Sequence, residues 1–187
     1  MRKIITLILA LTMIFSCAVL ASCGNETEQE APSGMKRASA EEASYIFYVP
    51  STWQCDVASG ATTAYYSNSD TSSVSVMTFA LENSDADAAD WWSSFEADFK
   101  NVYDDFEIES REDVKLDGVD GAKVVFTGAL THDGEDKVTF KFMQVAAVRK
   151  KTLSAPEVYV VTYTSSPEVY DNHLEEVQKM LDNFKFN

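Results

Sequence analysis

Residues 158–184 read VYVVTYTSSPEVYDNHLEEVQKMLDNF, and this stretch contains both secondary-structure periods of the chain. Its first seven residues are all β-branched or aromatic, which favours a buried strand over residues 158–164. We expect Ser166 to be the N-cap of a helix and Pro167 to be its first residue, where a missing N–H has no cost. Beyond them, apolar residues recur at spacings of four, three, four and three: Tyr170, Leu174, Val177, Leu181 and Phe184. The stretch therefore predicts a strand followed by an amphipathic helix that docks on a sheet.

A second helical pattern lies upstream, near the middle of the chain. From Trp91 onward, apolar residues three or four positions apart form one stripe, made of Trp92, Phe95, Phe99, Val102, Tyr103 and Phe106. This spacing predicts a helix. Ser84 or Asp85 is placed to cap its N-terminus, and the acidic residues at 85, 87 and 90 suit the positive end of a helix dipole.

Segments with strand character lie on both sides of this helix. They are residues 45–49, 53–57, 62–67 and 74–81 before it, and residues 106–116, 122–130, 137–149 and 158–164 after it. Glycine-containing turns at residues 117–121 and 132–134 predict hairpins between the later strands. The order of strands, helix, strands and helix predicts an α+β fold, with a central antiparallel sheet of about six to eight strands flanked by two main helices.

The parity of the apolar residues predicts which faces of the sheet these strands bury. In residues 74–81, the valines at 74 and 76 have one parity, and the apolar residues at 77, 79 and 81 have the other. We therefore expect this strand to be buried on both faces. In residues 106–116, the four apolar residues at 106, 108, 114 and 116 share a single parity.

The first 22 residues predict an export signal. Arg2 and Lys3 precede an apolar run over residues 4–15, and small residues follow, which is the order of a secretory signal peptide. The residues Leu20-Ala21-Ser22-Cys23 also resemble a bacterial lipobox. That resemblance implies cleavage before Cys23, a diacylglyceryl group on its sulfur, and a protein held on the extracytoplasmic face of the cell membrane. The alternative is that residues 4–21 remain as an uncleaved membrane helix, although 18 residues are at the short end for one.

The remainder of the chain divides into a tether and one domain. Residues 24–43 contain one large apolar residue, Met35, and cannot bury enough surface to order themselves. We therefore expect the lipidated cysteine and a flexible tether over residues 23–43. Residues 44–187 are long enough for one globular domain with its own core.

Charge and cysteine content limit the possible partners and the chemistry. The chain has 15 basic and 30 acidic residues, and removal of Arg2 and Lys3 with the signal leaves 13 basic residues and a net charge of −17. Such a balance argues against nucleic-acid binding, which requires a basic surface. After lipidation of Cys23, Cys55 is the one remaining thiol of the mature chain, so no internal disulfide is expected. We interpret Cys55 as a small, half-buried packing residue.

Three segments resemble PsbP-like domains over about residues 44–187. They are the opening strand from Tyr45 with Pro50-Ser51-Thr52-Trp53, the strand Tyr159-Val160-Val161-Thr162-Tyr163 with Ser166-Pro167-Glu168-Val169-Tyr170, and the end Leu181-Asp182-Asn183-Phe184-Lys185-Phe186. The resemblance implies an α/β/α sandwich around an antiparallel sheet. It also implies a non-enzymatic domain that binds or helps assemble other proteins. The matching motifs are structural, so no binding residue is carried over from the family.

The sequence contains no recognisable catalytic or metal-binding motif. His132 and His173 are its two histidines, and neither belongs to a zinc spacing such as H-x-x-H. We therefore predict no metal, no cofactor and no enzymatic activity. We interpret Asp133, Glu135 and Asp136 as a solvated acidic turn, because they lack the spacing of a calcium loop. The basic run at residues 149–151 is interpreted as a solvated loop.

Two pairs of neighbouring aromatic residues are the candidate partner surface. Core packing of both Trp91 and Trp92 is the favoured interpretation, but the two point about 100° apart on a helix, so one could lie at the rim of the buried stripe and contact a partner. Tyr65 and Tyr66 point to opposite faces of a strand. The predicted function is a membrane-tethered lipoprotein that binds or helps assemble an unknown envelope protein. A solute-binding lipoprotein and a hydrolase are the alternatives.

Overall fold

The structure is a computed structural model, and it describes residues 30–58, 61–82, 85–131, 136–150 and 155–187. The chain divides into two units, Met1–Glu30 and Ala31–Asn187, and only the second is described below. Its helices are α2 (Ala88–Val102), the 3-10 helix η1 (Tyr170–His173) and α3 (Leu174–Asp182). Its strands are β1 (Met35–Arg37), β2 (Tyr45–Ile46), β3 (Tyr48–Pro50), β4 (Gln54–Ala58), β5 (Ala61–Tyr65), β6 (Ser73–Ala80), β7 (Asp104–Leu116), β8 (Val119–Leu130), β9 (Val138–Arg149), β10 (Glu157–Ser165) and β11 (Lys185–Phe186). No helix among these residues is long and apolar enough to cross a membrane.

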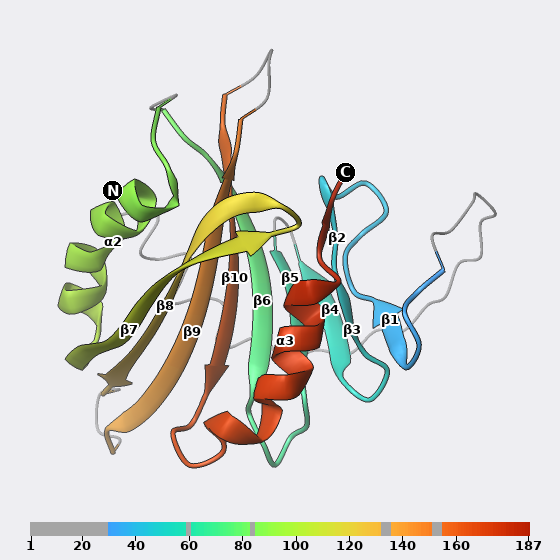
Figure 1. The fold of residues 1–187 in the computed structure, drawn as a ribbon. Coiled ribbons are helices and arrows are strands. Elements are labelled where there is room, and N and C mark those ends of the chain that lie inside the picture. The colour runs from blue at the N-terminus through green and yellow to red at the C-terminus, as the bar shows by residue number, and fades with distance from the viewer. Residues whose placement is uncertain (1–29, 59–60, 83–84, 132–135, 151–154) are drawn as a thin grey trace. The chain divides into compact units, whose positions relative to one another are not determined.

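Seven strands form the central antiparallel sheet, in the order β4-β5-β6-β10-β9-β8-β7 (Figure 1). Two short ribbons, β1-β3 and β11-β2, accompany it. Helices α2 and α3 cover opposite faces of the sheet, because alternate residues of β10 pack with one helix and then the other: Tyr159, Val161 and Tyr163 with α3, and Val158 and Val160 with α2. The predicted α+β sandwich is therefore confirmed.

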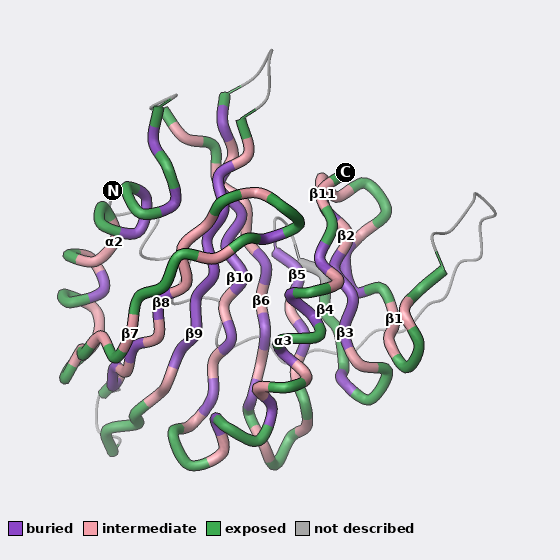
Figure 2. Tube along the Cα trace, viewed as in Figure 1, coloured by how far each residue is buried: buried purple, intermediate pink, exposed green. Residues whose placement is uncertain are grey.

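Burial is concentrated along the central strands of the sheet (Figure 2). From residue 142 to residue 148, every residue of β9 is buried, and β10 is buried over residues 158–161. In β6, Val74 and Val76 lie in the α3 cluster, and Phe79 packs against the α2 cluster. The prediction that residues 74–81 are buried on both faces is therefore confirmed.

The strand β7 departs from the predicted single-face pattern. Phe106 and Ile108 pack against the α2 cluster, and Val114 and Leu116 belong to the α3 side. The reason is a break in register, since Ile108 pairs with Phe126 but Ser110 pairs with Val125. The one extra residue between these pairs reverses which parity faces which helix.

Both helices begin later than the sequence pattern predicts. Asp87 rather than Ser84 or Asp85 caps α2, because its side chain accepts from the N–H of Asp90 at 2.8 Å while Asp90 accepts from the N–H of Asp87 at 3.3 Å. The prediction that Ser166 caps the last helix is also wrong. Residues 167–169 form a turn, η1 follows, and α3 begins only at Leu174.

The start of η1 is tied to β10 by a contact that local spacing does not encode. The hydroxyl of Tyr163 donates to the carbonyl of Tyr170 at 2.8 Å. Both side chains are buried in the α3 cluster. A hydrogen bond from the preceding strand therefore holds this helix start, in place of the cap expected from Ser166 and Pro167.

Part of the predicted tether is folded. The strand β1 pairs with β3, and Ala38 and Ser39 are buried. The hydroxyl of Ser39 accepts from the N–H of Phe47 at 3.1 Å, and the N–H of Ser51 donates to the carbonyl of Gly34 at 2.9 Å. The folded unit therefore begins near residue 31 and not at residue 44. The segment has few apolar residues of its own, so its composition predicted a tether. Its ordering comes from backbone pairing with β3, which composition does not report.

The hairpin between β7 and β8 confirms the turn expected at Asp117-Gly118. These residues have φ values of 44° and 79°, which are the two left-handed positions of a tight two-residue turn. Asp117 also accepts from the N–H of Phe186 at 2.9 Å and from Lys185 at 2.9 Å, so the turn is joined to β11. These donors outweigh the burial of Asp117 and lower the pKa of its carboxyl.

Candidate functional site

A compact group of polar and aromatic side chains joins the start of α3 to the loop after β5. We call it the His173 cluster, and it consists of Trp53, Tyr66, Asp70, His173 and Glu176. Trp53 belongs to the turn before β4, and Tyr66 directly follows β5. The cluster therefore connects three segments that are far apart in the sequence.

The imidazole of His173 lies between two carboxylates. Its Nδ1 is 2.8 Å from Oε2 of Glu176, and its Nε2 is 3.0 Å from Oδ2 of Asp70. His173 itself is only 6% exposed. A neutral imidazole carries one N–H, so both contacts are hydrogen bonds only when the ring is a protonated imidazolium.

The protonation of His173 follows from these contacts. Burial disfavours the charged ring, but the hydrogen bonds and negative charges of Asp70 and Glu176 outweigh it and raise the pKa of His173 above its ordinary value. Burial likewise opposes ionisation of Asp70, and its bonds to Ser72 and His173 reverse this and lower its pKa. Each partner therefore favours the charged form of the other.

Local turn chemistry holds Asp70 in place. Its side chain accepts from the N–H of Ser72 at 2.9 Å, and its own N–H donates to the hydroxyl of Ser67 at 3.2 Å. The N–H of Tyr66 donates to the carbonyl of Ser72 at 2.9 Å and closes the loop. Short polar side chains favour such turns because they bond the nearby backbone.

Three rings pack together above the charged groups. The Tyr66 ring lies 4.3 Å from the His173 ring, and the Trp53 ring meets His173 edge-on at 5.5 Å. Trp53 is fully buried, and its indole N–H donates to Oε2 of Glu176 at 3.2 Å. Tyr66 is 37% exposed, so part of its ring faces solvent. The exposed part of the Tyr66 ring therefore lies beside two buried side chains that contact it.

The geometry of His173 does not suit general base catalysis. A Ser-His-Asp triad needs one ring nitrogen facing a hydroxyl nucleophile, whereas both nitrogens here face carboxylates. Within the described ranges, no three His, Cys, Asp or Glu side chains are arranged to hold a metal ion. Both ring nitrogens of His173 are therefore occupied by carboxylates, which fixes the relative positions of these side chains.

The structure separates the four aromatic residues of the predicted partner surface. Trp91 and Trp92 belong to α2, are 5% and 1% exposed, and pack in the core between that helix and the sheet, so neither is available to a partner. Tyr65 is half-buried, and its strand register places it on the α2 face of the sheet. Tyr66 remains as the exposed member, on the His173 cluster.

Other predicted positions have mixed outcomes. The lipobox residues Leu20, Ala21, Ser22 and Cys23 lie outside the described residues, as do His132, Asp133 and Glu135. Cys55 is exposed on β4, so its interpretation as a half-buried packing thiol is wrong, and β4 is the edge strand that exposes it. Partial desolvation by neighbouring atoms still raises the pKa of the Cys55 thiol more than nearby Lys36 lowers it, which disfavours the reactive thiolate.

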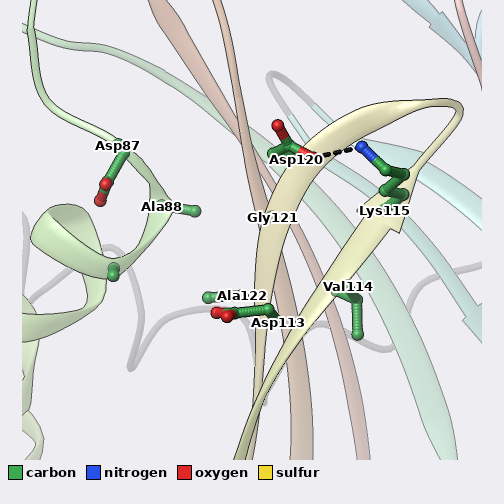
Figure 3. Close-up of a pocket in the computed structure, with 9 residues that line it drawn as sticks. Asp87, Ala88, Asp113, Val114, Lys115, Asp120, Gly121 and Ala122 are labelled. Atoms are coloured by element: carbon green, nitrogen blue, oxygen red, sulfur yellow. Dashed lines mark hydrogen bonds and ion pairs between the residues drawn. The ribbon is translucent and has the colours of Figure 1, made fainter.

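An acidic notch lies between the start of α2 and the β7–β8 hairpin (Figure 3). Its volume is about 460 Å³, and Ala88, Gly121 and Ala122 lie between Asp87 on the helix side and Asp113 on the hairpin side. All of the charged residues around it are exposed. The notch is open, and it lacks the buried apolar lining of a typical small-molecule pocket.

The His173 cluster was missed by the sequence reasoning. The spacing of His173 and Glu176 places them on one helix face, and Asp70 lies in an evident turn. The helix-face spacing and the turn are separate local patterns, and Asp70 lies 103 positions from His173 in the sequence. Only the docking of α3 beside the β5–β6 loop brings them together.

Comparison with known proteins supports the fold. No protein-family model matches the sequence, and no curated protein is significantly similar to it. Solved structures do match. Cyanobacterial PsbP (CyanoP) from Synechocystis sp. PCC 6803 has a TM-score of 0.59 at 14% identity, over 90% of this chain and 99% of that one.

Two further solved structures have the same arrangement. LpqN, involved in cell envelope biogenesis of Mycobacterium tuberculosis, has a TM-score of 0.58 at 12% identity, over 82% of this chain and 90% of its own. The Ran-binding protein Mog1p of Saccharomyces cerevisiae has a TM-score of 0.53 at 13% identity, over 81% and 95%. The predicted PsbP-like fold is therefore confirmed. Because the sequence identities are only 12–14%, these likenesses show the fold alone.

Proposed function

We propose that this chain is a lipoprotein held on the extracytoplasmic face of the cell membrane through Cys23, and that its domain binds or helps assemble another envelope protein. The anchor rests on the likeness of Leu20-Ala21-Ser22-Cys23 to a lipobox. The binding role draws on the fold, which occurs in a Ran-binding protein and in a protein of cell envelope biogenesis. The domain acts without catalysis.

The observation that carries the binding role is the setting of Tyr66. An aromatic ring that is exposed and already fixed in position loses little conformational entropy when a partner covers it. Tyrosine is also enriched among the residues that dominate binding energy. The His173 cluster supplies that fixation, since Tyr66 contacts both Trp53 and His173.

Photo-crosslinking in the cells that produce the protein would test this role. A photo-reactive amino acid replaces Tyr66 in one variant and Val138 in a matched control, because Val138 is also exposed but lies on β9. We expect a discrete crosslinked envelope protein from position 66 and none of that size from position 138. Equal products from both positions, or none from position 66 in a folded and membrane-bound protein, would contradict the proposal.

The anchor has a separate test. Intact-mass measurement of the membrane-extracted protein should give a chain that begins at Cys23 and carries lipid. Replacement of Cys23 by serine should release the protein from the membrane fraction. A chain that still begins at Met1 would exclude the lipoprotein.

Solute binding is the second candidate function, and the notch between α2 and the β7–β8 hairpin is its site. Its volume of about 460 Å³ falls in the range of ligand pockets. Carboxylates at Asp87 and Asp113 would suit a small organic cation, while Asp120 is already paired with Lys115 of the same lining. Titration calorimetry with a panel of small amines would test it, with Asp113→Asn as the variant expected to weaken any heat of binding.

A further inference from the structure

The folding of residues 31–43 onto the domain changes how far the domain can stand from an anchor at Cys23. The strand β1 pairs with β3, and Ala38 is buried in the α3 core cluster. What lies between Cys23 and the folded unit is therefore residues 24–30, seven residues, in place of the twenty that composition suggests. At about 3.5 Å per residue, the eight steps from Cys23 to Ala31 span at most about 28 Å in any conformation.

We infer that the domain is held against the membrane surface with its β1–β4 side toward the bilayer and its β7 edge away from it. This inference rests on the proposed lipid anchor at Cys23. A globular unit of about 160 residues has a diameter of roughly 40 Å, so the connection is shorter than the domain that it holds. A connection of that length restricts which side of the domain can face the anchor point.

The point of attachment lies at one edge of the sheet. The N–H of Met35 donates to the carbonyl of Pro32 at 2.9 Å, and Gly34 bonds to Ser51 just before β4. Lys36 of β1 lies close enough to Cys55 of β4 for its charge to offset part of the rise that desolvation causes in the pKa of the thiol. Figure 1 likewise shows β1 beside the β4 side of the sheet, with β7 at the opposite edge. The anchor therefore connects to the β4 edge.

The distribution of charge favours the same orientation. Helix α2 and strand β7 together contain nine acidic and three basic residues, all at the far side of the sheet from β1. Around the attachment point, Lys36 and Arg37 balance Glu41 and Glu42. A bilayer with anionic lipids repels the α2–β7 side more strongly than the β1–β4 side.

The orientation also limits the partner. A domain restricted in this way can reach only proteins whose binding surface lies within the connection plus the domain diameter of the bilayer, roughly 70 Å. The partner is therefore a protein embedded in, or lying close to, the same membrane. Cell-wall components farther out would be beyond reach.

Energy transfer from the protein to labelled lipids would test the orientation. The exposed thiol of Cys55 carries a donor dye on β4, and in a matched protein Cys55→Ser is combined with Glu107→Cys to place the same dye on β7. The two edges are six strand spacings apart, about 29 Å. Both proteins are extracted with their lipid and reconstituted in vesicles that contain acceptor lipids. We expect clearly higher transfer from position 55 than from position 107.

A spacer variant makes the test specific to the length of the connection. Twenty glycine and serine residues inserted between Glu30 and Ala31 lie outside the folded unit and should leave the melting temperature unchanged. They should lower transfer from position 55 and bring the two positions together. Equal or reversed transfer in the lipidated native-length protein, or no effect of the spacer, would overturn the orientation alone. An intact mass that begins at Met1 would overturn the proposed anchor together with it.

Discussion

The two faces of the central sheet are stabilised in different ways. On the α3 face, buried polar groups are bonded to each other: the hydroxyl of Tyr45 meets that of Thr62 at 2.8 Å, Tyr163 donates to Tyr170, and His173 joins two carboxylates. The α2 face is dominated by ring contacts. Among the described residues, the buried side-chain polar atoms without a partner are Nε1 of Trp91, Nε1 of Trp92 and Oε1 of Gln144, and all three lie on that face.

This difference indicates a division of roles. Packed rings stabilise the fold chiefly through the apolar area that they bury, whereas hydrogen-bonded networks add directional bonds that fix relative positions. The face that carries the exposed Tyr66 is the one with directional bonds. The α2 face supplies hydrophobic area, and its aromatic stack of Trp92, Phe99 and Phe126 has no comparable positional demand.

The largest effect is expected from truncation on the α2 face. Trp92→Ala removes an indole that is 1% exposed and leaves a cavity against Phe126, so it should cost about 3–5 kcal/mol of unfolding free energy. Urea denaturation followed by circular dichroism would measure it. The exposed neighbour Ser93→Ala is the control and should change little. A loss below about 1 kcal/mol for Trp92→Ala would mean that the α2 face contributes less area than its burial indicates.

Loss of the imidazolium should come next. His173→Leu leaves Asp70 and Glu176 facing an apolar side chain, and we expect a cost of roughly 2–4 kcal/mol, below that of a fully buried pair because both carboxylates reach solvent. Combining it with Asp70→Asn should cost less than the sum of the two single changes. Full additivity in denaturation experiments would show that the two residues do not interact.

Stability should depend on pH through the same cluster. The raised pKa of His173 means that its contribution is complete below its ordinary pKa of 6.5 and is lost as pH rises through the raised value. The lowered pKa of Asp70 means that its contribution is present above 3.8 and is lost as pH falls through the lowered value. The combined stabilisation is therefore complete between about pH 4 and 6.5.

The alkaline loss should be smaller than that of His173→Leu, because a neutral imidazole still donates one hydrogen bond. Unfolding free energies measured from pH 5 to 9, with an NMR titration of the His173 ring, would check this. His173→Gln is the matched variant, and its unfolding free energy should fall less as the pH rises from 6.5 to 9. If His173→Gln lost as much unfolding free energy at alkaline pH as the native protein, the pH dependence would belong to other groups.

A conservative pair of substitutions compares the faces directly. Trp53→Phe and Trp92→Phe remove the same atoms from buried indoles, but only the N–H of Trp53 has a partner, Oε2 of Glu176. Trp53→Phe should therefore cost about 1–2 kcal/mol more than Trp92→Phe. Equal costs would mean that the Trp53 bond contributes little, and that the contrast between the faces lies elsewhere.

The smallest effect is expected from the surface ion pairs beside α2. Glu96 accepts from Lys100 at 2.7 Å and from Arg111 at 2.5 Å, and both cations are well exposed. Glu96→Gln should cost less than about 1 kcal/mol, and the cost should shrink further in 0.5 M salt. A loss as large as that of His173→Leu would remove the distinction between a buried and an exposed charge cluster.

Periodicity was sufficient for the elements whose partners are local. The stripe around Trp92 predicted α2, and the opposed parities within residues 74–81 predicted burial on two faces. Asp117-Gly118 predicted its turn because two successive left-handed residues favour that dipeptide. These features follow from the backbone preferences of residues that lie next to one another.

Contacts across the sheet decided what periodicity could not. A register break in β7 reversed the faces of Val114 and Leu116, and pairing with β3 folded a segment that has the composition of a tether. The His173 cluster, including the contact between Tyr66 and His173, likewise depends on how α3 docks.

The amino-acid sequence by itself determined the α+β order of elements, the acidic charge and the likeness of Leu20-Ala21-Ser22-Cys23 to a lipobox, because each is a property of neighbouring residues or of composition. Only the tertiary structure decided where the folded unit begins, which aromatic ring faces solvent, and which carboxylates meet His173. Those outcomes depend on pairs of residues far apart in the chain, whose contact energy no local pattern contains.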